Sequence, residues 1–343
     1  MSTFQPALRA LHIGSMPHTD VHQACRLTWQ HFAEVPAWPQ LPRRTFHENM
    51  YAQFSERFPG LVLEDDRVWV DRTRDLGPDL EALYAACLED DLSYGETSPT
   101  YALGLHTFLE QAAARDRPPA YVKGQVTGPV SWGLTVVDQD RRPTLYDEIL
   151  ADAIARHLRL KARWQERALR QVCPQTILSV DEPYMSSFGS AYVALGREQA
   201  IALMEEVFSG IQGLKMVHCC GNTDWSLLLA TPMDILSFDA YGYAANLALY
   251  PDEVAAFLDR GGTLAWGITP KTPDAYHESV ASLVEALLAA MDLLAQKGIH
   301  RDEVMQASLI TPSCGLGSLS EDLAGRVFEL TSGVSQAMRE RYG

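Results

Sequence analysis

The chain has 343 residues, of which 47% are hydrophobic and 21% charged, an ordinary composition for a globular protein. Its formal net charge of −16 argues against nucleic acid or an anionic membrane as a partner, because both are polyanions. No stretch of 18 apolar residues occurs and the N-terminus lacks a signal pattern, so we expect a cytoplasmic protein that binds no membrane. Six cysteines in a chain of this length do not make a disulfide framework, which favours reduced thiols.

Short apolar segments alternate with longer amphipathic ones along the chain. The apolar segments predict strands at Ala10–Gly14, Val35–Leu41, Ala120–Val126, Thr176–Val180, Leu214–Cys219, Asp234–Phe238, Thr263–Ile268 and Ser308–Thr311. The amphipathic segments predict helices at Tyr146–Val172, Arg197–Ser209, Pro251–Arg260, Pro273–Lys297 and Glu321–Arg341. This alternation, which no linker interrupts, is typical of the α/β class and predicts a single (β/α)8 TIM barrel, with residues 1–343 forming one domain.

One segment does not fit that alternation. Leu61 to Val70 reads as two short strands around the acidic turn Asp65-Asp66, which predicts a small β-hairpin inserted after the second strand. We expect it to be a solvated surface hairpin.

Polar residues follow most of the predicted strands. In a barrel of this kind, the working residues lie at the C-terminal ends of the strands. The residues in these positions are Gly14 and Ser15, Gln125, Asp181 and Glu182, His218 and Cys220, Asp239, Trp266 and Gly267, and Cys314. The sequence therefore predicts that they gather at one rim.

The sharpest motif is His218-Cys219-Cys220, which is followed far downstream by Cys314-Gly315-Leu316. Side chains alternate between the two faces of a strand, so His218 and Cys220 share one face while Cys219 points to the other. An imidazole and two thiolates favour Zn²⁺, and three protein ligands leave a position open, as in catalytic zinc sites. The alternative is that all three are buried reduced residues, since free cysteine is among the most buried residue types. Their combination favours the metal.

The surrounding residues suit an amino acid. A zinc with two thiolates and one imidazole suits alkyl transfer to sulfur better than hydrolysis. The turn at Gly14-Ser15 can present backbone N–H groups to a carboxylate. His18 is ambiguous, because it can act at the site, while Asp20, two residues later, is better explained as a helix N-cap.

Together these motifs resemble the catalytic C-terminal barrel of cobalamin-independent methionine synthase. That family shares a superfamily with uroporphyrinogen decarboxylase and the zinc-dependent methylcobalamin:thiol methyltransferases. The matching stretches, in the family's order, are Ile13–Thr19, Val126–Val130, Val180–Pro183, His218–Cys220 and Cys314–Leu316. The decarboxylase branch is a poor match, because its N-terminal arginine motif is not recognisable and it needs no zinc.

The resemblance implies a methyltransferase that methylates L-homocysteine to methionine. It implies Zn²⁺ bound by His218, Cys220 and Cys314, with Asp239 where the family has a glutamate, either binding zinc, binding it through water, or supporting it. The implied substrate-binding residues are Ile13, Gly14, Ser15, Glu48, Asp181 and Glu182, with Asp181 and His18 as the implied catalytic residues. Asp181 would hold the ammonium, aided by Glu48, whereas a salt-bridged rim position and a role at the site are equally expected for Glu182.

The resemblance also bears on the methyl donor. Nothing in the sequence corresponds to the family's additional N-terminal barrel, which helps to bind polyglutamylated methyltetrahydrofolate. The chain is similar to the short core methionine synthases, and this implies a folate-independent enzyme with methylcobalamin, carried by a corrinoid protein, as donor and partner. The alternative is a zinc-dependent methylcobalamin methyltransferase acting on another thiol, such as a coenzyme M-like acceptor.

Overall fold

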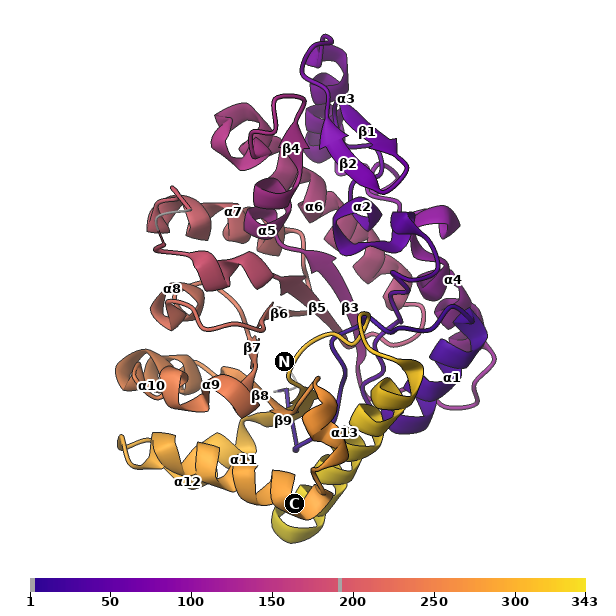
Figure 1. Ribbon diagram of the computed structural model, residues 1–343. Helices are drawn as coiled ribbons and strands as arrows, with labels where there is room; N and C mark the ends of the chain where they lie inside the picture. Colours follow the sequence, from indigo (N-terminus) through magenta and orange to yellow (C-terminus); the bar gives the residue numbers. More distant parts are fainter. Residues whose placement is uncertain (1–3, 191–192) are drawn as a thin grey trace.

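The computed structural model describes residues 4–190 and 193–343 (Figure 1). Its strands are β1 (Leu61–Glu64), β2 (Arg67–Val70), β3 (Val122–Thr127), β4 (Val137–Asp138), β5 (Thr176–Asp181), β6 (Leu214–Cys219), β7 (Ile235–Phe238), β8 (Thr263–Thr269) and β9 (Ser308–Pro312). Its α-helices are α1 (Val21–His31), α2 (Met50–Gln53), α3 (Gly77–Glu89), α4 (Pro99–Ala113), α5 (Pro129–Thr135), α6 (Glu148–Leu169), α7 (Arg197–Ser209), α8 (Trp225–Leu229), α9 (Ala240–Leu247), α10 (Pro251–Asp259), α11 (Val280–Ala295), α12 (Arg301–Gln306) and α13 (Glu321–Tyr342). Short 3₁₀ helices are η1 (Phe46–Glu48), η2 (Thr144–Tyr146), η3 (Pro183–Ser187) and η4 (Pro273–Tyr276).

The centre of the molecule is a six-stranded parallel sheet in the order β3-β5-β6-β7-β8-β9, with helices outside it (Figure 1). It confirms the α/β class and the six strands predicted from residue 120 onward, each within two residues at either end. In the register of β5 and β6, Asp181 lies opposite His218. The fold therefore places two of the predicted site residues side by side.

The first two predicted strands, Ala10–Gly14 and Val35–Leu41, are wrong as continuous strands. Each makes only isolated parallel bridges, which are Ala10 to Ile310, Ser15 to Gln40 and Ala37 to Lys123. Two features explain the interruption. Pro36 and Pro39 have no N–H to give to a ladder, and Gly14 has a φ of 137° that departs from strand geometry.

The predicted helices are confirmed with two corrections. The segment Pro273–Lys297 is not one helix: η4 comes first, and α11 starts after Ser279, which forms a capping box with Ser282. The helix predicted to reach Val172 ends at Leu169. Pro174 disfavours helical geometry at Cys173, so the helix could not extend past this point. No helix among the described residues is long and apolar enough to cross a membrane.

The β-hairpin is confirmed and lies beyond one end of the central sheet (Figure 1). β1 and β2 pair antiparallel, with Leu61 opposite Val70. The sequence did not show that β2 also pairs in parallel with β4, so that the hairpin belongs to a second sheet in the order β1-β2-β4. Val70 is fully buried, so the hairpin is anchored on one side rather than solvated all round.

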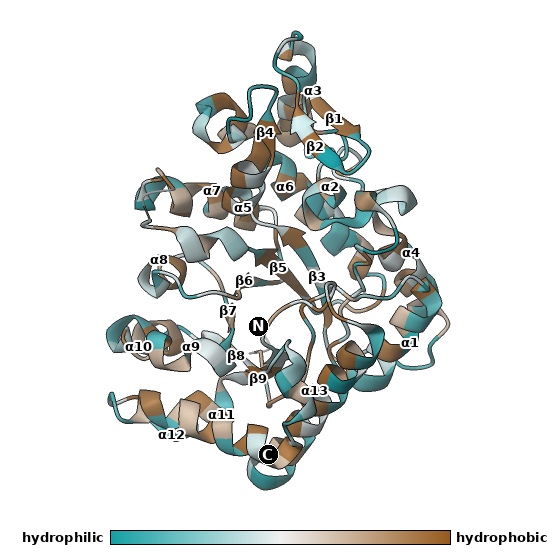
Figure 2. Ribbon diagram, viewed as in Figure 1, coloured by the Kyte–Doolittle hydropathy of each residue, from teal (hydrophilic) through white to brown (hydrophobic). Residues whose placement is uncertain are grey.

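The two faces of the central sheet carry different cores. One face packs against the helices and includes Val180, Val217 and Leu236 in the large apolar cluster. On the other face, alternate residues build a small separate cluster of Leu11, Val35, Ile177, Met216, Ile235, Ala265 and Leu309. Figure 2 shows hydrophobic residues along these strands, whereas the surrounding helices carry both hydrophobic and hydrophilic residues. We call the face that carries the small cluster the inner face. Because side chains alternate, this face continues toward the strand ends through Ser179, His218 and Ser237.

Candidate metal centre

His218, Cys220 and Cys314 come together at the C-terminal end of the sheet. One potential ligand atom from each residue lies within 4.8 Å of the others. His218 belongs to β6, Cys220 follows that strand directly, and Cys314 follows β9. His218 is buried and both cysteines are partly buried. In the described part of the chain, no other group of three such side chains meets this geometry.

The imidazole of His218 is oriented by a neighbouring strand. Its Nδ1 lies 2.9 Å from Oγ of Ser237, the residue opposite it in β7. The Nε2 atom is buried and has no hydrogen-bond partner in the described structure. A proton on Nδ1 leaves the Nε2 lone pair free, and this is the arrangement of a metal-binding histidine with a supporting partner. The residues therefore fit a zinc ion.

The two cysteines influence each other's ionisation. A hydrogen bond from Cys220 is the main cause that lowers the pKa of Cys314, although burial opposes it. The same contact, together with burial, raises the pKa of Cys220. Lys271 faces the pair: burial works against its charged form, but the attraction of Cys314 raises the pKa of Lys271. Both shifts thus favour ionisation of Cys314 over ionisation of Cys220.

Cys219 points away from this cluster, as strand alternation predicts. It is fully buried in the large apolar core, and its Sγ lies 3.5 Å from the carbonyl oxygen of Gly221. Burial raises the pKa of Cys219 to about 12. This thiol is therefore a packed core residue.

Asp239 lies near the cluster but does not belong to it. Its Oδ1 accepts the N–H of Gly242 at 2.8 Å and caps α9. The charges of Cys314 and His218 both affect its pKa, which burial raises above the usual range. Its place as a fourth zinc contact stays a prediction.

A cavity of about 380 Å³ opens beside the cluster. Its walls include the predicted residues Ile13, Ser15, Glu48, Asp181, His218, Cys220 and Cys314, together with Gln40, Pro42, Asn49, Met50, Pro183, Gly315, Gly317 and Ser318. The structure thus gathers most of the predicted site in one place. Gly14 lies between two wall residues, whereas His18, Glu182 and Asp239 are not part of the wall.

Asp181 offers the cavity an acceptor for a cation. The residue is 7% exposed, and its Oδ1 accepts a hydrogen bond from Oγ of Ser179 at 2.6 Å. Its Oδ2 has no hydrogen-bond partner among the described residues. Burial raises the pKa of Asp181, while the charges of Lys123 and His218 oppose this rise. An ammonium arriving at Oδ2 would favour the carboxylate further.

Glu48 lies in the wall of the cavity with its charge already paired. Arg44 approaches both carboxylate oxygens, at 3.1 and 3.2 Å. The backbone N–H of Leu103 donates to the same group at 2.8 Å. Its charge is thus met by the protein itself, and its predicted role in holding an ammonium stays a prediction.

Glu182 is buried and caps a helix, so it does not form the rim salt bridge that was one of its two expected roles. Its two oxygens accept the backbone N–H groups of Val130 and Ser131, at 2.9 and 2.8 Å, and the Ser131 hydroxyl at 2.6 Å. These donors belong to the first turn of α5. Burial is the main cause that raises the pKa of Glu182 to about 7. This geometry positions the segment after β3.

His18 and Asp20 lie at the start of α1. Asp20 accepts the N–H groups of His22 and Gln23, so the predicted N-cap is confirmed. His18 is 1% exposed, its Nδ1 has no partner among the described residues, and burial lowers its pKa. Its role near a methyl donor stays a prediction.

Sequence reasoning missed two lysines. Lys123 lies fully buried on the inner face of β3, and Lys271 follows β8 beside Cys314. A signal existed for the first, since a lysine between Val122 and Val126 is unusual in a buried strand. Nothing in the local sequence marks Lys271.

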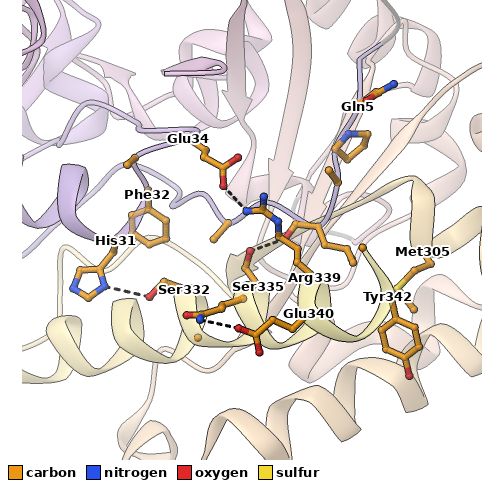
Figure 3. Close-up of a pocket in the computed structure, with 18 of the residues that line it drawn as sticks. Gln5, His31, Phe32, Glu34, Met305, Ser332, Ser335, Arg339, Glu340 and Tyr342 are labelled. Carbon is orange, nitrogen blue, oxygen red and sulfur yellow. Dashed lines mark hydrogen bonds and ion pairs between the residues drawn. The ribbon is translucent and has the colours of Figure 1, made fainter. Parts of the chain in front are cut away.

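Another cavity, of about 1310 Å³, is larger than the one beside the cluster (Figure 3). It lies toward the N-terminal end of β9, because Met305 and Gln306 line it. It is lined by the N-terminal segment, the end of α1 and the end of α13, which the ion pairs of Glu34 with Arg9 and Arg339 hold together. His31 lies 3.2 Å from Ser332 in the same region. None of the predicted site residues lines this cavity, so size alone would locate the site wrongly.

The fold belongs to the class of α/β proteins with a parallel sheet and polar residues at the C-terminal strand ends. Over 97% of this chain, it is similar to a B12-independent methionine synthase from Shewanella sp. W3-18-1 in complex with selenomethionine, with a TM-score of 0.63, 17% identity and 98% of that chain covered. Over 100% of this chain, it is similar to a methyltransferase from Methanosarcina mazei, with a TM-score of 0.56, 11% identity and 95% of that chain covered. At these identities the likeness shows a shared fold. No family profile and no curated protein matches the sequence.

Proposed function

We propose that this protein is a zinc-dependent methyltransferase that moves a methyl group to the thiol of L-homocysteine and forms methionine. The observation that carries the proposal is the His218–Cys220–Cys314 cluster in the wall of the cavity that also contains Asp181. A soft metal site and an acceptor for an ammonium in one small cavity suit an amino acid with a thiol side chain.

The division of labour follows from the side chains. His218, Cys220 and Cys314 would hold the zinc, which when bound lowers the pKa of a thiol and keeps its sulfur nucleophilic. Asp181 would bind the substrate ammonium through Oδ2, and the N–H groups near Ser15 would bind its carboxylate. Holding both ends of the amino acid fixes the sulfur for in-line attack on the methyl carbon. The thiol proton would pass to solvent. As the carbon–sulfur bond forms, the bond between the methyl group and its donor would break, and its electron pair would stay on the donor, which for methylcobalamin gives cob(I)alamin.

The choice of homocysteine is supported by the comparison. The Shewanella protein of similar fold is a methionine synthase seen with selenomethionine, an amino acid of methionine's shape. The resemblance of the motifs to those of the methionine synthase family supports the same choice. A coenzyme M-like thiol lacks the ammonium that the free Oδ2 of Asp181 would bind, so homocysteine is favoured.

The donor is a separate part of the proposal: a methylated corrinoid such as methylcobalamin, brought by a corrinoid protein. It rests on the resemblance to the core methionine synthases. The Shewanella protein of similar fold is, in contrast, a B12-independent enzyme. Any assay therefore needs both a corrinoid donor and methyltetrahydrofolate.

We also infer that the central sheet closes into an eight-membered (β/α)8 barrel and that residues 1–343 form one domain. The support is the set of three isolated bridges. They join the first N-terminal segment to β9, the two N-terminal segments to each other, and the second segment to β3. Closure would place the small apolar cluster inside the barrel, with the candidate metal centre above it at the C-terminal rim.

Binding of the methyl acceptor, L-homocysteine, can be tested without any methyl donor. The protein is loaded with Co²⁺ in place of zinc, and L-homocysteine is titrated while the sulfur-to-cobalt absorption is followed. We expect a saturable increase in wild type and a much weaker response with a coenzyme M-like thiol. The Asp181→Asn variant should bind cobalt normally and require more homocysteine. No spectral change with any thiol would contradict the proposal, and an equal response to both thiols would contradict the choice of homocysteine.

A further inference from the structure

A buried lysine lies beneath the candidate site. Lys123 is 0% exposed, and its Nζ donates to the carbonyl oxygen of Ile13 at 2.6 Å and to Oε1 of Gln125 at 3.1 Å. A buried ammonium costs free energy unless acceptors take its hydrogen bonds. The position of the Lys123 ammonium therefore depends on its two acceptors. Burial lowers the pKa of Lys123 to about 8, while the charge of Asp181 opposes that effect.

The bond to Ile13 has a consequence for the next peptide group. The chain has no cis peptide bond among the described residues, so the Ile13–Gly14 peptide is trans and planar. In a trans peptide the C=O and the N–H point in opposite directions. A carbonyl of Ile13 held toward Lys123 therefore directs the N–H of Gly14 away from it. That N–H has no acceptor in the described structure, and its neighbours Ile13 and Ser15 both line the cavity.

The turn is supported from the same side. Gly14 has a φ of 137°, and a Cβ at this position would lie 2.7 Å from the side-chain amide carbon of Gln125. Gln125 is itself fixed, because its Nε2 donates to the carbonyl oxygen of Trp38 at 3.1 Å. Lys123 and Gln125 thus pack against the Ile13–Gly14 backbone from the same side and restrict its position.

We propose that Lys123 is a positioning residue that holds the Ile13 carbonyl so that the Gly14 N–H is presented to the carboxylate of the amino-acid substrate. The inference rests on the proposed function, since it assigns a role within the same amino-acid site. The ammonium of Lys123 and the substrate carboxylate lie on opposite sides of the peptide, and the peptide dipole is aligned with both charges.

A matched pair of lysines tests this assignment. Lys161 on α6 is also 0% exposed and donates from Nζ to a backbone carbonyl, that of Glu96 at 2.6 Å, outside the candidate site. Binding of L-homocysteine is compared with binding of 3-aminopropane-1-thiol, the same molecule without its carboxylate, to zinc-loaded wild type, Lys123→Met and Lys161→Met. Both ligands share the ammonium and the thiol, so the ratio of their dissociation constants isolates the carboxylate.

We expect Lys123→Met to reduce the preference for the carboxylate-bearing ligand roughly 10- to 100-fold, the effect of a hydrogen bond to a charged group. Lys161→Met should leave the ratio unchanged. An unchanged ratio in a folded, zinc-loaded Lys123→Met protein would overturn the inference, as would an equal loss in Lys161→Met.

A second measurement needs no variant. The dipeptide Ile-Gly occurs once in the sequence, so labelling isoleucine carbonyls with ¹³C and glycine with ¹⁵N gives one carbonyl-correlated amide signal, that of Gly14. This signal should shift downfield when L-methionine saturates the protein, but not with 3-(methylthio)propylamine. If calorimetry shows that wild type binds L-methionine and the signal stays in place, this inference fails alone. If wild type binds neither L-methionine nor L-homocysteine, it falls together with the proposed function.

Discussion

Replacing Ser237 with alanine should weaken zinc binding without removing a ligand. The hydroxyl of Ser237 lies 2.9 Å from Nδ1 of His218, and this contact holds the imidazole in place and leaves Nε2 as the nitrogen available to a metal. In the alanine variant the ring can rotate and take the other tautomer. The loss of a partner of this kind lowers metal affinity by about 10- to 100-fold, or roughly 1.4 to 2.8 kcal/mol.

The assay is a competition between the protein and a chromophoric chelator for zinc at neutral pH. A matched control is Thr311→Val, which also removes a buried hydroxyl, in this case from β9. The Oγ1 of Thr311 has no hydrogen-bond partner in the described structure, so its loss should leave zinc affinity unchanged. Zinc affinity within twofold of wild type in Ser237→Ala would refute the role given to this contact, and an equal loss in both variants would point to general loosening instead.

Three further results are expected. Cys220→Ser and Cys314→Ser should each lose most of their zinc by metal analysis, while Cys219→Ser, altered in the core, should keep it; full zinc content in Cys314→Ser would contradict the ligand set. Asp181→Asn should raise the KM for homocysteine about 10- to 100-fold with zinc retained, since it weakens a charged hydrogen bond; an unchanged KM would show that the ammonium binds elsewhere. Burial lowers the pKa of Lys161 to about 7. Above that pH the unfolded chain binds a proton that the folded chain lacks. The free energy of unfolding should therefore rise with pH until the unfolded lysine titrates near ~10.4. Denaturant titrations should show a flatter rise in Lys161→Met, and an equal slope in both proteins would contradict the assigned pKa.

The sequence predicted the strands of the central sheet well because buried parallel strands are continuous apolar runs. The two N-terminal segments were wrongly predicted as continuous strands. Their apolar residues face a core, but Gly14 in the first segment and Pro36 and Pro39 in the second interrupt the ladder. Apolar patterning reports burial and does not count hydrogen bonds. For the same reason, the break before Ser279 was missed, since capping by Ser282 depends on side-chain hydroxyls.

The sequence predicted which residues gather at the site, including the distant Cys314, but not every contact that each of them makes there. Alternation alone separated Cys219 from His218 and Cys220. The ion pair of Glu48 with Arg44 could have been predicted from the sequence, because Arg44 precedes Glu48 by four residues. In contrast, the capping of α5 by Glu182 depends on how two strand ends lie in space. No local pattern carries that information.

The most direct measurement is methionine formation itself. Zinc-loaded protein is incubated with L-homocysteine and a donor whose methyl group is labelled with ¹³C, either methylcobalamin or methyltetrahydrofolate, and labelled methionine is measured by mass spectrometry. Cys314→Ser serves as the metal-deficient control. We predict labelled methionine from methylcobalamin with wild type and none with the variant. Synthesis from methyltetrahydrofolate alone would contradict the corrinoid donor, and no methionine from either donor would contradict the assignment as a homocysteine methyltransferase.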